Sequence, residues 1–235
     1  MRASETVSLD AFSSDAYQRH NRRRQEHLAS LHLDIAGRSV LEVGAGIGDH
    51  TSFFVDRGCR VTSTDGRREC IETLALRHPN VRTMLYDANE EPSDELQPHE
   101  IVYAYGILYH LGRPERAIHS MARLCSEFLL LETCVSPGRD AAVPFVTEAL
   151  TDPSQALDGL GCRPTRSWVF DQLSRAFSHV YVTRTQPWHE QFPLDWSNLA
   201  QAPDALRRSV FVASHRPIDN PLLSPTLIEH QVRGP

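Results

Sequence analysis

The chain has 235 residues, of which 40% are hydrophobic and 23% are charged, and these values are ordinary for a globular protein. The length fits one α/β domain with a few additional elements. The formal net charge of −6 at pH 7 disfavours a broad surface that binds nucleic-acid phosphates. No apolar run approaches the ~20 residues that a membrane span requires, so we expect no membrane association.

The beginning of the chain and its cysteines predict the compartment. The first thirty residues are polar and lack the apolar segment of a secretory signal, which predicts a cytoplasmic protein. The five cysteines are scattered, odd in number and without a C-x-x-C pair. This pattern argues against a disulfide framework and against a zinc site. We therefore expect reduced, mostly buried cysteines and no metal.

Residues 10–31 have helical rather than strand character. Tyr17, Asn21 and Arg24 recur at intervals of four and three residues, so a helix would carry them on one face. We interpret residues 1–34 as an N-terminal helical extension.

An apolar strand is predicted at residues 39–43, and it leads directly into a turn with three closely spaced glycines. They follow the pattern Gly44-x-Gly46-x-Gly48, and the acidic Glu42 stands two residues before the first. Glycine tolerates positive φ and has no Cβ, so such a turn lets a ligand approach the backbone. A dinucleotide fingerprint would have its third glycine one residue later, so the pattern points away from a pyrophosphate ligand.

A second strand is predicted at residues 60–65, where β-branched residues alternate along the sequence. It ends at Asp65, 19 residues after Gly46. A carboxylate at this place in a βαβ unit binds the two hydroxyls of a ribose, because ligands of open α/β sheets lie beyond the carboxyl ends of the strands. The alternative role of Asp65 is to cap the next helix.

The combination E-x-G-x-G-x-G after a strand resembles motif I of the class I S-adenosylmethionine (SAM)-dependent methyltransferases. The resemblance covers about residues 35–215 and implies a doubly wound, seven-stranded, mostly parallel α/β sheet with an antiparallel last strand. It implies a SAM-binding domain at residues 35–216, over whose cofactor cleft the extension 1–34 lies as a lid, and the alternative is that Tyr17 simply packs this helix onto the domain. The cofactor-binding residues that the resemblance implies are Glu42, Gly44, Ala45, Gly46, Gly48, His50, Asp65, Gly66, Asp87, Ala88, Tyr105 and Gly106.

The remaining elements follow in chain order. Further helices are predicted at residues 49–57, 67–77, 114–126 and 168–177, and further strands at 81–86, 100–105, 128–133, 179–185 and 209–214. Asp87 and Ala88 follow one of these strands where the resembling family binds adenine, and the alternative is an acidic loop.

The candidates for chemistry lie after the fourth and fifth strands, beside the expected cleft. A histidine near neutrality acts as a general base toward a hydroxyl, a carboxylic acid or an amine, whereas the alternative role of His110 is packing. Glu132 ends the fifth strand beside the same cleft. The candidate catalytic residues are His110, Tyr105, Tyr109, Glu132, Tyr17 and Asn21.

The segment 134–166 is too long for a plain loop, and we interpret it as a substrate-side insert. Near its end, Arg163 and Arg166 either grip a carboxylate or are ordinary surface arginines. The linker 186–208 is rich in aromatic residues, so it is expected to pack over the substrate pocket or at a dimer contact. The tail 217–235 contains four prolines and is expected to be extended.

We therefore predict a SAM-dependent methyltransferase that transfers a methyl group to an oxygen or nitrogen of a small molecule, in specialised metabolism, as a monomer or homodimer. One alternative is a SAM-consuming cyclase that makes azetidine-2-carboxylate and methylthioadenosine in an aromatic pocket of Tyr17, Tyr105, Tyr109 and Trp168.

A second alternative is modification of transfer RNA. It rests on the basic run at residues 19–24 and on a short likeness of Leu131-Glu132-Thr133 to wobble-uridine carboxymethyltransferases, and the negative net charge disfavours it. A third alternative is a regulatory module that binds SAM without catalysis.

Overall fold

The computed structural model of the protein describes residues 9–197 and 206–234. Parts of the predicted extension, linker and tail, namely residues 1–8, 198–205 and 235, lie outside the described residues.

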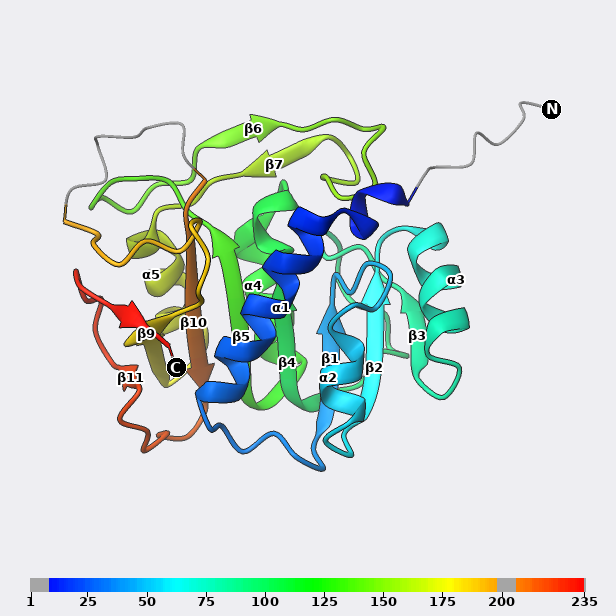
Figure 1. Ribbon diagram of the computed structural model, residues 1–235, viewed down its shortest axis with the longest axis horizontal. Helices are drawn as coiled ribbons and strands as arrows, with labels where there is room; N and C mark the ends of the chain where they lie inside the picture. Colours follow the sequence, from blue (N-terminus) through cyan, green and yellow to red (C-terminus); the bar gives the residue numbers. More distant parts are fainter. Residues whose placement is uncertain (1–8, 198–205, 235) are drawn as a thin grey trace.

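Within the described residues, an eight-stranded sheet in the order β11-β8-β10-β5-β4-β1-β2-β3 forms the centre of the molecule (Figure 1). Its strands are β1 (Ser39–Val43), β2 (Arg60–Asp65), β3 (Arg82–Leu85), β4 (His99–Tyr105), β5 (Cys125–Cys134), β8 (His179–Thr183), β10 (Arg208–Ser214) and β11 (Leu223–Ser224). Neighbouring strands from β5 to β3 are parallel, whereas β10 is antiparallel to both β5 and β8. The predicted doubly wound sheet with an antiparallel last strand is confirmed, and β11 adds an eighth strand at one edge.

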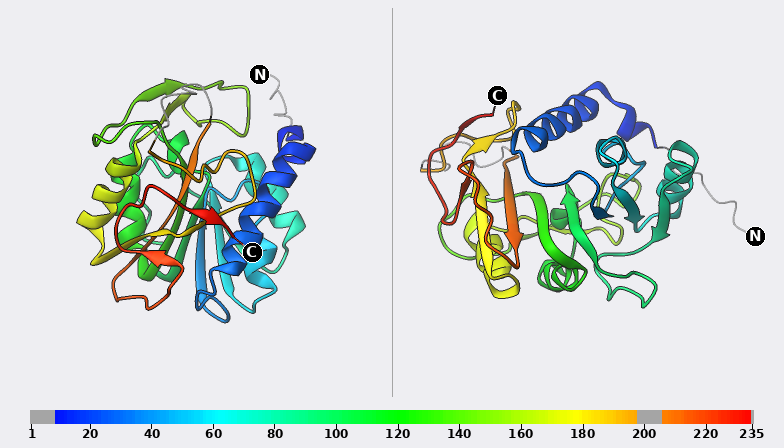
Figure 2. Two further views of the ribbon diagram at one scale, coloured as in Figure 1. Left: turned by 60° about the vertical axis from the view of Figure 1, so that its left-hand side comes forward. Right: turned by 90° about the horizontal axis from the view of Figure 1, so that it is seen from below.

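Helices cover both faces of this sheet (Figure 2). They are η1 (Asp10–Ser13), α1 (Asp15–Ser30), α2 (Thr51–Val55), α3 (Arg68–Arg77), η2 (Leu108–His110), α4 (Pro114–Arg123) and α5 (Arg166–Ala176), where η marks a 3₁₀-helix. Leu28 of α1 and Phe54 of α2 pack on one face of the sheet, and Ile118 of α4 and Leu173 of α5 pack on the other. Because Leu28 is only 1% exposed, α1 belongs to the core of the domain.

Local sequence explains where the helices begin. The Ser14 hydroxyl caps α1 by accepting a hydrogen bond from the Tyr17 N–H at 3.3 Å. Thr165 caps α5 in the same way through the Trp168 N–H at 3.3 Å. Pro114 opens α4, where its missing N–H costs nothing.

The insert and the tail contain more regular structure than the sequence predicts. In the insert, β6 (Phe145–Thr147) and β7 (Leu160–Cys162) form an antiparallel pair, which lies across the end of the sheet where β5 terminates (Figure 1). The tail supplies β11 and also β12 (Val232–Arg233), which pairs with β9 (Thr185–Gln186). The extended tail therefore becomes part of the fold through backbone pairing, which side-chain patterns do not reveal.

The described part of the chain has no helix that is both long and apolar enough to cross a membrane. All five cysteines carry free thiols, and four of them are buried. Burial raises the pKa of the Cys70 and Cys162 thiols to about 12, so both stay protonated at neutral pH.

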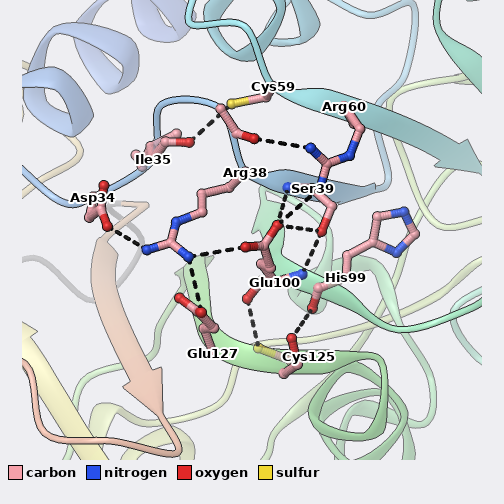
Figure 3. A network of polar contacts seen from close by, with 12 residues as sticks. Asp34, Ile35, Arg38, Ser39, Cys59, Arg60, His99, Glu100, Cys125 and Glu127 are labelled. Carbon is pink, nitrogen blue, oxygen red and sulfur yellow. Dashed lines mark hydrogen bonds and ion pairs between the residues drawn. The ribbon is translucent and has the colours of Figure 1, made fainter.

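A polar network fastens the amino-terminal ends of three strands, opposite the end at which a ligand is expected (Figure 3). The carboxylate of Glu100 in β4 accepts hydrogen bonds from the Ser39 N–H at 2.7 Å and from Arg38 Nη1 at 3.0 Å. Arg38 Nη1 also donates to Glu127 of β5 at 3.1 Å. The Ser39 N–H and the Arg38 guanidinium hold the pKa of Glu100 down at about 2.

We predict that Glu100→Gln lowers the melting temperature at pH 7, and that this loss shrinks as the pH falls from about 5 toward 2. The pKa of Glu100 is lower in the folded chain than its ordinary value of 4.5, so its contribution is present above 4.5 and disappears as the folded carboxylate is protonated. Melting curves across this range measure the effect, with Glu72→Gln at an exposed position of α3 as the control. A difference that does not depend on pH contradicts the prediction.

Candidate active site

A cavity of about 450 Å³ lies at the carboxyl ends of the parallel strands, beneath α1. Gly44 and Gly46 follow β1, Asp65 ends β2 and Asp87 follows β3, so these lining residues form what we call the glycine end. We call the opposite part of the cavity the arginine end. It lies where β5 ends and β10 begins and includes Arg208. In the sheet order, β5 and β10 lie on the other side of β4 from β1.

The glycine turn has the backbone geometry that its sequence predicts. Gly44, Gly46 and Gly48 have φ values of +71°, +56° and +83°. A Cβ on Gly44 would lie 2.8 Å from the side chain of Ile107, so no larger residue fits there. A Cβ on Gly48 would lie 2.9 Å from Leu74 of α3, so this glycine permits close helix packing.

Both predicted carboxylates of the glycine end line the cavity. Asp65 Oδ2 accepts the Gly46 N–H at 2.8 Å, and its Oδ1 accepts the Arg67 N–H at 2.9 Å. The Cys70 thiol also hydrogen-bonds to this carboxylate. Each carboxylate oxygen accepts about two hydrogen bonds, so an acceptor position of Asp65 remains for a ligand. Asp87 Oδ1 accepts the Asn89 N–H at 2.9 Å, and Ala88 lines the cavity beside it.

Glu42 does not line this cavity but lines a small one beside it. It is 2% exposed and accepts hydrogen bonds from Thr51 Oγ1 at 2.6 Å and Ser63 Oγ at 2.8 Å. Burial raises its pKa to about 7. These bonds join β1 to β2 and α2, so the structure favours a supporting role for Glu42 behind the glycine turn.

His50 and Ala45, two other predicted cofactor residues, line a small adjacent cavity of about 20 Å³ with Asn21. His50 Nδ1 lies 2.5 Å from the Tyr103 hydroxyl, and burial lowers the pKa of His50 to about 3. Tyr17 lines both cavities, and burial raises its pKa to about 12. Tyr17 is therefore the predicted catalytic candidate of α1 that contacts the main cavity, whereas Asn21 contacts the small one.

A buried ion network forms the arginine end. Glu132 Oε2 lies 2.5 Å from Arg24 Nη2, and Glu132 Oε1 lies 3.1 Å from Arg208 Nη1. The side chains of Arg24, Arg208 and Glu132 are 5%, 7% and 0% exposed. Arg208 Nη2 also donates to the Tyr109 hydroxyl at 2.9 Å. Glu132 is enclosed by both guanidinium groups and does not itself line the cavity.

His110 lines the same cavity and is oriented by a carboxylate from the insert. Its Nδ1 lies 2.5 Å from Glu148 Oε2. Burial lowers the pKa of His110 below its usual value, although Glu148 opposes this shift. Burial alone would raise the pKa of Glu148, but bonds from His110, the Ala156 N–H and Arg163 hold it at about 2. Glu148 is therefore ionised and accepts a proton-bearing Nδ1, which leaves Nε2 of neutral His110 unprotonated.

Sequence reasoning missed several residues of this site, which are Glu148, Arg208, His20, His189 and Gln191. His20 and His189 stack with ring centroids 4.6 Å apart, and both line the cavity. The aromatic richness of the linker was the signal for His189, whereas the sequence carries no comparable signal for Glu148 or Arg208.

Three other predicted candidates lie elsewhere. Trp168 lines a separate surface groove, so it does not belong to an aromatic pocket. Arg163 forms an ion pair with Glu148 at 2.9 Å, and Arg166 stacks 3.9 Å above the ring of Trp196. Neither arginine lines the main cavity, so the structure does not support the predicted carboxylate grip there, although the buried Arg166 Nη2 has no hydrogen-bond partner among the described residues.

The carboxylates and the backbone of the glycine end fit SAM. The glycine turn leaves space that a Cβ would fill, and the partly buried Asp65 carboxylate keeps an acceptor position free. A second carboxylate, Asp87, lies beside Ala88 at the same cavity. These are groups that a ribose and an adenine need. Among residues 9–197 and 206–234, no three side chains of histidine, cysteine, aspartate or glutamate lie together in a way that could hold a metal ion.

Solved structures with this fold include methyltransferases. The N-terminal domain of EvdMO1, determined in the presence of S-adenosylhomocysteine (SAH) and D-fucose, matches with a TM-score of 0.65 and 21% identity over 86% of this chain and 85% of that one. The 1,6-didemethyltoxoflavin-N1-methyltransferase of Burkholderia thailandensis, determined with its namesake compound and SAH, matches with a TM-score of 0.53 and 19% identity over 87% and 80%. At these identities the likeness establishes the fold.

An uncharacterised methyltransferase of Mycobacterium bovis is 34% identical over 92 residues, which are 39% of this chain and 37% of that protein. The match thus spans little more than a third of the relative's length. A family model described as a methyltransferase domain matches residues 17–181, which is most of the chain. The chain therefore belongs to this methyltransferase family, and its fold is that of the class I SAM-dependent methyltransferases, as its glycine turn predicts.

Proposed function

We propose that the protein transfers a methyl group from SAM to an oxygen or nitrogen nucleophile of a small molecule. The observation that carries the proposal is His110, a buried neutral imidazole that faces the cavity and is oriented by Glu148. A hydroxyl gains most from such a base, because its oxygen becomes a good nucleophile only as its proton leaves.

The glycine end supplies the binding groups for the cofactor. Asp65 would bind the ribose hydroxyls, Asp87 and Ala88 would bind the adenine, and Gly44 and Gly46 would let the ligand approach the turn. When bound, SAM supplies a methyl group on a positively charged sulfonium, which is already an activated leaving group. The task of the chain is to align the nucleophile with that methyl group.

His110 would receive the proton of the acceptor on Nε2. Glu148 fixes the imidazole by its bond to Nδ1 and stabilises the imidazolium that forms, as the carboxylate does in a serine hydrolase triad. Tyr109 packs against His110 with ring centroids 3.9 Å apart and further limits how the imidazole can turn. Tyr17, His20 and Arg24 line the cavity from α1, so we also propose that this helix covers the cleft as a lid.

Two observations weigh against the alternative functions. Of the four aromatic residues that the cyclase hypothesis places in one pocket, Tyr17, Tyr105 and Tyr109 line the main cavity, whereas Trp168 lies in another groove. The transfer-RNA hypothesis rests on the basic run, in which Arg19 pairs with Glu190, Arg23 with Glu26 and Arg24 with Glu132. Two of the similar structures were determined with the small molecules D-fucose and 1,6-didemethyltoxoflavin, which agrees with a small acceptor. The cytoplasm and specialised metabolism stay predictions from the sequence.

The function is tested by the thioether that the protein releases from SAM. The purified protein is incubated with SAM alone and then with SAM and pools of small hydroxylated and amino compounds, and the products are identified by mass spectrometry. We expect SAH that appears only with an acceptor. Methylthioadenosine formed from SAM alone would overturn methyl transfer in favour of the cyclase.

We predict that Asp65→Asn weakens SAH binding about ten- to hundredfold. The substitution removes charge-assisted hydrogen bonds, whose typical worth is about 1.5–3 kcal/mol. Isothermal titration calorimetry measures the affinity, and Asp56→Asn at an exposed position after α2 is the control. Equal affinity of the Asp65→Asn variant and the wild type would remove Asp65 from the cofactor site.

We predict that Glu148→Gln lowers the pKa of His110 further below 6.5. The carboxylate raises this pKa against the larger opposite effect of burial, so its removal leaves burial unopposed. NMR titration of isotope-labelled histidines measures the shift, and the His110→Gln variant identifies the resonance. Glu72→Gln, at an exposed position of α3, should leave the His110 titration unchanged. An unchanged or raised pKa in Glu148→Gln contradicts the proposed orientation.

A further inference from the structure

The arginine end holds more positive than negative charge. Two buried guanidinium groups, Arg24 and Arg208, share the single carboxylate of Glu132. The neighbouring His20 and His189 are neutral, because burial lowers the pKa of each imidazole and both arginines lower it further. Burial likewise raises the pKa of the Tyr105 and Tyr109 phenols, so neither contributes negative charge.

No other acid of the described residues that line the cavity can balance this charge. Asp65 and Asp87 lie at the ends of β2 and β3, on the far side of β1 and β4 from β10. Glu190 is 65% exposed at its side chain and forms an ion pair with Arg19. A desolvated guanidinium without a counterion is costly, so the arginine end is suited to a ligand that brings one negative charge.

Hydrogen-bond donors are also in excess at Arg208. Nε donates to Gln191 Oε1 at 2.8 Å, Nη1 to Glu132 and Nη2 to the Tyr109 hydroxyl. A guanidinium has five N–H groups, so after these three bonds one N–H remains on each Nη. The Tyr109 oxygen accepts from Arg208, so its own proton is available to donate. These two N–H groups and the phenol can donate hydrogen bonds to a carboxylate.

The cofactor does not supply the missing charge. SAM carries an ammonium, a carboxylate and a sulfonium, so its net charge is +1 and its binding adds to the positive charge of the cavity. Within the arginine end, Arg24 also lines the small cavity with Gly44 and packs close to Gly106. Arg208 does not line that small cavity, so it is the guanidinium available to the acceptor.

We propose that the acceptor is a small hydroxy acid, whose carboxylate binds Arg208 and Tyr109 while its hydroxyl faces His110. A carboxylate balances the single excess positive charge of the network of Arg24, Arg208 and Glu132, and its two oxygens suit a guanidinium. Arg208 thereby determines specificity, because the amide or ester of the same acceptor would leave the excess positive charge of the arginine end without a counterion. This inference rests on the proposed methyl transfer and names the substrate class of the same site.

The test compares acids with their neutral amides. The probes are 3-hydroxybenzoate, 4-hydroxybenzoate, 4-hydroxyphenylacetate and mandelate, each with its primary amide, and binding is followed by thermal melting and calorimetry at saturating SAH. We expect at least one acid to bind about ten- to hundredfold more tightly than its amide. In Arg208→Gln this preference should disappear, whereas Arg208→Lys should keep part of it through the remaining charge.

Arg23→Gln is the matched control, because Arg23 lies on the same helix as Arg24 but is exposed and pairs with Glu26. It should keep the full preference for acids. If Arg208→Gln does not fold, Tyr109→Phe replaces it, and a severalfold loss of acid binding with unchanged amide binding is expected.

Two results overturn the inference while SAH still binds. One is that no acid binds better than its amide to the wild type, and the other is that the Arg208→Gln variant keeps the preference. Absence of SAH binding to the wild type contradicts instead the proposed function, so the two failures are distinguishable.

Discussion

Glu132 is fully buried at the end of β5 and forms ion pairs with Arg24 from α1 and Arg208 from β10. It therefore joins α1 to β10, and these two ion pairs hold α1 in place over the cavity. Removing one partner of a buried ion pair typically costs about 3–5 kcal/mol, because the other charge is left uncompensated. An apolar trio of similar volume is often equally stable, so stability alone does not explain why charges occupy this position. Their value lies in holding two guanidinium groups at fixed places beside a ligand cavity.

The sequence predicts the glycine end of the site much better than the arginine end. A glycine turn after a strand and an acid after the next strand lie close together in sequence, and the parallel register of β1 and β2 brings Gly46 and Asp65 within one hydrogen bond. Local spacing therefore carries the information. Glu42 shows the limit of this reasoning, since its place in the motif is clear but its side chain turns into the core to meet Thr51.

The arginine end is built from residues far apart in the sequence. Arg24 and Glu132 are 108 positions apart, and Tyr109 and Arg208 are 99 apart. Neither contact follows from a strand or helix period, because each depends on how α1 and β10 pack against the finished sheet. Glu148 lies in an insert that composition describes only as a long loop, and backbone pairing of β6 with β7 brings it to His110. Tertiary packing, which one sequence does not specify residue by residue, decides these contacts.

The two ends of the cavity differ in charge, and His110 lies where this difference affects chemistry. At the glycine end, two backbone N–H groups hold the partly buried Asp65 carboxylate in place. Because this carboxylate accepts hydrogen bonds, it favours a ligand that offers hydroxyls. At the arginine end the excess positive charge favours an anion. Arg208 and Arg163 also repel a proton on His110 and so help burial to lower its pKa. A guanidinium that attracts an anionic acceptor thus also keeps the imidazole unprotonated, so binding of the acceptor and readiness of the base depend on one charge.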